Sequence, residues 1–156
     1  PLPSRAFASI LYLEEQVFGG KYFRSLHRLA SHALLLLVFL HTLRVILTGA
    51  YRKPRELNWV IGFVILCLTI FTTYTGYLLP LDQLALWATR TGMEFIAILP
   101  GGDLVRTLLM PDGMNGSLTL LRFYILHIAL LPLIIFGLVL LHFYKIRQNK
   151  GILPYL

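Results

Sequence analysis

Three long apolar stretches alternate with polar segments along the chain. They run from about residue 29 to 47, from 58 to 79 and from 118 to 144. A helix needs about 20 apolar residues to cross a bilayer, so each stretch is long enough for a transmembrane helix. Mixed segments at 5–18, 82–98 and 102–110 predict short helices along the membrane surface, the last two separated by a Pro-Gly-Gly break. The pattern predicts an all-α membrane protein, a helical bundle with three spans in one domain over residues 1–156.

Composition supports a membrane protein and argues against an intrachain disulfide and against a c-type haem. Of the 156 residues, 57% are hydrophobic and 13% are charged, whereas a soluble domain carries about a quarter charged residues. Cys67 is the one cysteine, so an intrachain disulfide cannot form. No CxxCH motif occurs, so we expect no covalently attached c-type haem.

The net charge of +7 follows the topology rather than a nucleic-acid site. Basic residues crowd into the short loop after the first span and into the segment after the third, with Glu56 as the acidic residue among them. Basic and acidic residues are mixed on the other side, which includes the link of residues 81–117. We therefore place the first side on the negative face of the membrane, and we expect no nucleic-acid partner.

All five histidines lie in the first and third helices, and the second span has none; four of them form two pairs with nearly equal spacing. His27 and His41 are 14 residues apart, and His127 and His142 are 15 apart. At 100° and 1.5 Å per residue, each pair shares a helix face to within about 60° and spans about 21–22 Å. His32 lies about 140° around the helix from His27, so we interpret it as structural.

The first and third spans run parallel if the second returns between them. His27 then lies level with His127 near the positive side, and His41 with His142 near the negative side. Facing histidines in a bundle can clamp a planar haem by axial coordination, so we predict two b haems with these four residues as iron ligands. A single histidine could equally hydrogen-bond a neighbouring helix. Four at matched depths favour function, because polar groups in a bilayer are costly.

Arginines lie close to these histidines. Arg24 and Arg28 flank His27, Arg44 lies one turn beyond His41, and Arg122 precedes His127. Haem propionates need cationic partners near the interface, which makes all four candidates. The alternative is ordinary snorkelling of arginines at helix ends.

One proline and two glycines affect the backbone geometry and packing of the spans. Pro132 predicts a kink in the third span. Gly62 and Gly76 allow close approach of the second span, either to a porphyrin face or to a neighbouring helix as ordinary small-residue packing.

Several motifs resemble the cytochrome b family, and most closely its chloroplast and cyanobacterial b6 branch with its bacterial relatives. They are RSLHR around His27, LHTLRVILTGAYRKPRELNWV over 40–60, TGYLLPLDQ over 75–83 and LTLLRFYILH over 118–127. Together with the four histidines, they cover nearly the whole chain. Leu81 departs from the family, which usually has tryptophan there, and a helix that usually precedes the first span is not in this sequence. No additional haem on that helix can therefore be assigned.

The resemblance implies a quinol–cytochrome c or quinol–plastocyanin oxidoreductase. Quinol would be oxidised on the positive side, with one electron passing to a Rieske iron–sulfur protein. The other would cross from the haem of His27 and His127 to that of His41 and His142 and reduce a quinone on the negative side, so that protons are moved across the membrane.

We expect the quinol pocket between the end of the second span and residues 82–98. An apolar turn around Pro80 and a long link suit a hydrophobic ring at membrane depth, with Tyr77 and Ala88 as further pocket residues. The family's Pro-Glu-Trp-Tyr motif is not in this sequence, so the resemblance implies a subunit IV-like partner that supplies it.

The other implied partners are a c-type cytochrome, a second copy in a homodimeric complex, and the lipid bilayer. The implied membrane is the bacterial plasma membrane, or alternatively the thylakoid. Two other functions stay open at this point: a di-haem anchor subunit of a membrane hydrogenase or formate dehydrogenase, and a haem-free scaffold.

Overall fold

The computed structural model describes residues 2–148, and this part of the chain contains helices and no strand. The helices are α1 (Pro3–Gln16), α2 (Gly20–Leu47), α3 (Glu56–Leu78), α4 (Gln83–Ile98), α5 (Gly102–Leu109), α6 (Ser117–Ile125), a π-helix η1 (Leu126–Leu130) and α7 (Leu131–Gln148). The predicted all-α membrane fold is confirmed. The last part of the predicted domain, 149–156, lies outside the described residues.

Three continuous helical rods are long and apolar enough to cross a membrane: α2 with 28 residues, α3 with 23, and α6–η1–α7 with 32. Their apolar side chains are largely exposed, and α2 buries none of its residues. A surface of this kind is stable where lipid, a cofactor or another helix covers it. The first helix begins at Gly20 rather than near residue 29, because the helix continues past the apolar stretch through a polar turn that contains His27.

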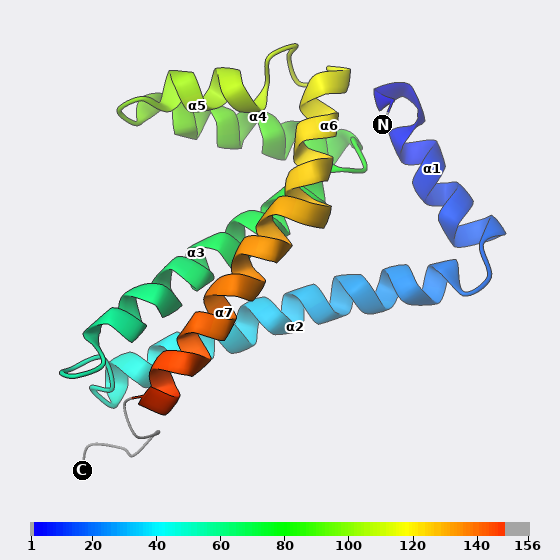
Figure 1. Cartoon of the computed structure of the whole chain (residues 1–156). Helices are drawn as coiled ribbons and strands as arrows, with labels where there is room; N and C mark the ends of the chain where they lie inside the picture. The colour runs from blue at the N-terminus through cyan, green and yellow to red at the C-terminus, as the bar shows by residue number, and fades with distance from the viewer. Residues whose placement is uncertain (1, 149–156) are drawn as a thin grey trace.

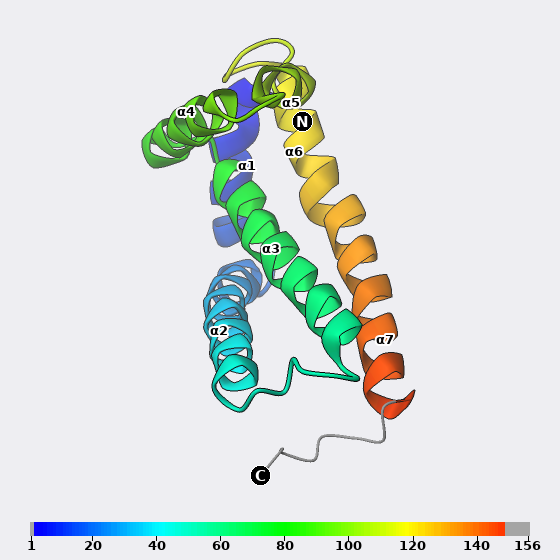
Figure 2. The ribbon, with the colours of Figure 1, turned by 90° about the vertical axis from the view of Figure 1, so that its left-hand side faces the viewer.

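The second span lies between the other two (Figure 1, Figure 2). α3 packs along the α6–η1–α7 rod on one side and against α2 on the other. α2 and α7 therefore both pack on α3, and their backbones do not pack tightly against each other. This arrangement puts the two histidine-bearing helices on either side of one central helix.

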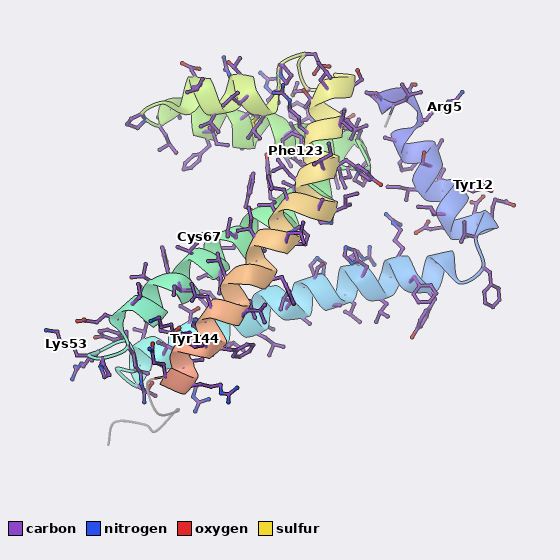
Figure 3. The ribbon with its side chains drawn as sticks, in the orientation of Figure 1. Arg5, Tyr12, Lys53, Cys67, Phe123 and Tyr144 are labelled. Atoms are coloured by element: carbon purple, nitrogen blue, oxygen red, sulfur yellow. The ribbon has the colours of Figure 1, made fainter. Side chains whose placement is uncertain are left out.

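The two ends of the bundle differ in character (Figure 3). α4 and α5 form a pair beside α6 at the end near Phe123, whereas the α2–α3 connection with Lys53 and the end of α7 with Tyr144 form the other end. Leu78, Met93 and Phe123 make a buried cluster that joins α3, α4 and α6. The fold thus anchors the long link between the second and third spans to the bundle.

Polar caps determine how this link enters and leaves the spans. The turn after α3 passes through Leu81 at φ 50°, a left-handed conformation that is uncommon for leucine. Asp82 then accepts a hydrogen bond from the Ala85 N–H at 2.8 Å and so caps α4.

Asp112 caps the start of α6 from four residues upstream of its N-cap. Its carboxylate accepts hydrogen bonds from the hydroxyl of Thr119 at 2.7 Å and from the N–H groups of Leu118 and Thr119 at 2.8 and 3.0 Å. These bonds, that of the Thr119 hydroxyl first, hold the pKa of Asp112 below its usual range. A side chain at Gly116 would overlap the carboxylate, so glycine is needed there. The cap orients the rod that carries His127 and His142.

Candidate haem site: two histidine pairs between α2 and α7

The four predicted ligands form two facing pairs. His27 of α2 lies opposite His127 of η1, with ring centroids 6.0 Å apart. His41 of α2 lies opposite His142 of α7, with centroids 6.5 Å apart. The ring planes within the pairs are nearly perpendicular, at 87° and 82°. Residues 100 and 101 positions apart in the sequence thus meet at two levels of the bundle.

These separations suit one metal ion between each pair of rings. A metal–imidazole bond of about 2 Å on each side puts the two nitrogens about 4 Å apart and the ring centroids about 6 Å apart. Among residues 2–148 no group of three or more histidine, cysteine, aspartate or glutamate side chains could hold a metal. A pair can therefore bind an ion that brings its other ligands with it, and haem iron, held in a porphyrin, is such an ion.

His127 is held by hydrogen bonds that its Nδ1–H donates to oxygens of α3. Its Nδ1 lies 3.0 Å from the carbonyl oxygen of Thr72 and 3.3 Å from the hydroxyl of Thr75. A carbonyl only accepts, so Nδ1 carries the proton and the lone pair of Nε2 stays available to a metal. Nδ1 of His142 is buried and makes no full hydrogen bond in the described part of the chain, although the backbone carbonyl of Asn58 interacts with this histidine.

Gly62 and Gly76 lie directly against the histidine rings. A Cβ at Gly62 would be 3.1 Å from Cε1 of His142, and a Cβ at Gly76 would overlap the ring of His127. The two glycines are 14 residues apart, the same spacing as His27 and His41. The structure shows the close approach of the second span to a neighbouring helix, because the two glycines make room for the His142 and His127 rings of the third span.

The π-helix corrects the one-residue mismatch between the two ligand spacings. The N–H of Leu131 bonds to the carbonyl of Leu126, an i→i+5 pattern that absorbs one extra residue in the turn. The 15-residue step from His127 to His142 then rotates like a 14-residue step, about 40° short of four turns, as in α2. Sequence reasoning missed this feature, although the unequal spacings signal it. It directly precedes Pro132, where the kink was predicted.

The four candidate arginines divide into two groups. Arg24 forms an ion pair with Glu14 of α1, and Arg122 donates to the carbonyl of Leu108 at the end of α5. Arg28 and Arg44 are exposed on α2, on the turns next to His27 and His41. Arg28 and Arg44 are therefore better placed than Arg24 and Arg122 to bind an anionic group such as a propionate.

The predicted quinol residues lie at the α3–α4 corner. Tyr77 is exposed on the last turn of α3, and Pro80 lies in the turn that follows. Ala88 packs on the Leu78 cluster, and its carbonyl accepts the hydroxyl of Tyr74 at 3.1 Å.

None of the three lines the cavity of about 440 Å³ between α4 and α5. That cavity is lined by other residues of the link: Arg90, Met93, Glu94, Arg106, Thr107, Met110, Pro111 and Met114.

Comparison with known proteins gives consistent matches. Residues 32–155 match the family described as cytochrome b (N-terminal)/b6/petB. Cytochrome b6 of Heliobacterium mobile is 43% identical over 148 residues, which cover 94% of this chain and 70% of that protein. The menaquinol:cytochrome c reductase cytochrome b subunit of Bacillus subtilis is 42% identical over 92% of this chain and 65% of its own length.

A solved chain from a hyperthermophilic respiratory complex III has the same fold. It matches 95% of this chain with a TM-score of 0.83 and 31% identity. This chain spans 40% of the length of that chain.

We predict that Gly76→Ala removes the haem at His27–His127, because the added methyl group overlaps the His127 ring. Gly62→Ala should reduce the haem at His41–His142 only partly, because a contact of 3.1 Å is relieved by a small shift. Gly137→Ala is the control, since a Cβ there meets nothing within 4 Å. Haem content per chain measures all three, and equal content in all three variants would contradict the packing described.

We predict that deletion of Ala129 preserves both haems, because the π turn becomes an α turn and the rotation of His142 is unchanged. Insertion of one alanine after Leu138 should remove the haem at His41–His142, because it rotates His142 by about 100°. Haem content and redox titration distinguish the two variants. If the Ala129 deletion loses the haem at His41–His142 as completely as the insertion does, the π turn does not set the rotation of His142.

Proposed function

Because this chain belongs to the cytochrome b/b6 family, we propose that it forms the part of a quinol-oxidising cytochrome b that carries electrons across a membrane through two b haems. The membership confirms the predicted family and its place in membrane electron transport. It carries with it haem b binding and an interaction with quinol. The hydrogenase-type anchor and the haem-free scaffold are the less favoured functions, because neither accounts for this membership.

The distances between the paired histidine rings carry the proposal. We assign His27 and His127 as the residues that would hold one haem and His41 and His142 as those that would hold the other, based on the ring separations of 6.0 and 6.5 Å. A haem b held by two histidines accepts and releases one electron at a time. The chain itself orients the rings, keeps Nε2 of His127 deprotonated and leaves room beside each ring at Gly62 and Gly76.

The arginines would neutralise the propionates. We assign Arg28 and Arg44 to this role because they are exposed beside the ligand histidines. Arg24 and Arg122 stay candidates, although each would have to leave its present partner, Glu14 or the Leu108 carbonyl. Within a bilayer, the apolar side chains of α2, α3 and α7 would exclude water between the two levels, which would strengthen every charge interaction there.

We further propose that quinol is oxidised at the α3–α4 corner near Tyr77, Pro80 and Ala88, on the side of His27 and His127. The exposed Tyr77 and the apolar turn support this position. We expect the pocket to be completed by a subunit IV-like chain with Pro-Glu-Trp-Tyr.

The complex would also contain a Rieske iron–sulfur protein and a c-type cytochrome. We expect it to be homodimeric and to lie in a bacterial plasma membrane, with a thylakoid membrane as the alternative.

We predict that the protein contains two b haems per chain and that His142→Ala removes only the one at His41–His142. The remaining haem should still be reduced by quinol, but it should pass no electron to the negative side, so steady-state turnover falls at least tenfold. Pyridine haemochrome analysis and redox titration measure both effects. One haem in the parent protein, or loss of both haems from a folded His142→Ala protein, would contradict the assignment.

We predict that Tyr77→Ala lowers quinol turnover severalfold and weakens inhibition by positive-side inhibitors, with both haem spectra unchanged. Tyr124→Ala is the matched control, because Tyr124 is an exposed tyrosine on α6 that is not part of the cluster around Leu78, Met93 and Phe123. Turnover of the assembled complex measures the effect. Unchanged turnover and inhibitor sensitivity in Tyr77→Ala would put the quinol site elsewhere.

A further inference from the structure

Thr75 is a polar residue with a completely buried side chain next to a ligand histidine. It lies on α3 with 0% of its surface exposed. Its hydroxyl is 2.8 Å from the carbonyl oxygen of Thr72 and 3.3 Å from Nδ1 of His127. Because Nδ1 is also 3.0 Å from the same carbonyl, the three groups form one small cluster.

The directions of these bonds follow from the groups involved. The Thr72 carbonyl can only accept, so the Thr75 hydroxyl donates its proton to it. The Thr75 oxygen then has lone pairs that face the N–H of His127. The N–H is shared between two oxygens, and the one on Thr75 is made more negative by its own donated bond.

Ordinary back-bonding to the helix does not describe this contact. The other three threonines of α3 donate to the carbonyl four residues earlier: Thr69 to Ile65, Thr72 to Leu68 and Thr73 to Thr69. Thr75 instead bonds three residues back, to the carbonyl that also receives His127. The buried hydroxyl thereby reaches a residue 52 positions away in the sequence.

The second histidine pair has only part of this arrangement. The backbone carbonyl of Asn58, four residues before Gly62 as Thr72 is four residues before Gly76, interacts with His142. Among residues 2–148, however, no group makes a full hydrogen bond to the buried Nδ1 of His142, and no side-chain hydroxyl contacts it. The two sites therefore have similar ligand geometry but different partners behind the ligand.

We propose that Thr75 is a positioning residue that sets the redox potential of the haem at His27–His127. This inference rests on the proposed function. The hydroxyl and the Thr72 carbonyl hold His127 in the Nδ1–H tautomer with Nε2 directed to the iron. A hydrogen bond from Nδ1–H raises the basicity of the ligand, and a more basic ligand stabilises ferric over ferrous iron. Thr75 thus lowers the potential of this haem and leaves the other unaffected.

The test is a redox titration of both haems in the assembled complex. Thr75→Val replaces the hydroxyl with a methyl group of nearly equal size and should raise the potential of the His27–His127 haem only. Thr75→Ser keeps the hydroxyl and should retain the parent potential. Thr73→Val is the matched control, because Thr73 is about 200° around the helix from Thr75 and should change neither potential.

Each outcome decides the proposal. A rise confined to the His27–His127 haem in Thr75→Val, absent from Thr75→Ser, supports it, and so does loss of that haem in Thr75→Val with retention in Thr75→Ser. Unchanged potentials in Thr75→Val, equal shifts of both haems, or equal effects of the valine and serine variants overturn it. A parent protein without two haems would instead contradict the proposed function.

Discussion

The gap between the facing histidine rings of α2 and of the α6–η1–α7 rod is the constraint on which the rest of the structure depends. Ring centroids must stay about 6 Å apart for one metal to bind both nitrogens, so the two ligand helices cannot pack tightly on each other. α3 resolves this by packing against both helices and keeping them apart. Its glycines at 62 and 76 let the rings of His142 and His127 come close without a clash.

The same constraint explains the irregular third span. Its two proposed ligands are 15 residues apart, and those of α2 are 14 apart. A regular α-helix would turn His142 away from the face that its partner requires, so the π turn at Leu126–Leu130 removes the excess rotation. The departure from α-helical geometry thus lies at His127, one of the two histidines whose relative rotation it adjusts.

The two levels differ in what lies behind the ligands. His127 has a carbonyl and a hydroxyl as hydrogen-bond partners, whereas His142 has the Asn58 carbonyl nearby but no full hydrogen bond to its buried Nδ1 within residues 2–148. In an apolar bundle such differences in hydrogen bonding have a large electrostatic effect, because little water is present to compensate for them. Two sites with almost the same ring geometry can therefore have different electronic properties, which directional electron transfer across a membrane requires.

Much of this protein follows from local sequence information. Apolar length defines the three spans, and two fixed numbers, 3.6 residues per turn and 1.5 Å per residue, put each pair of histidines on one face at two depths. The short helices at 82–98 and 102–110 also follow from local pattern, and the observed α4 and α5 lie within a residue of those bounds.

Tertiary structure decided what local pattern does not encode. The glycine contacts, the partner of His127 and the engagement of Arg24 and Arg122 each depend on which face of one helix meets another. The π turn depends on the same thing, because the α2 ligand face sets the rotation that α7 must match. Helix periodicity specifies a face but not its neighbour, so these features could be known only once the helices were packed.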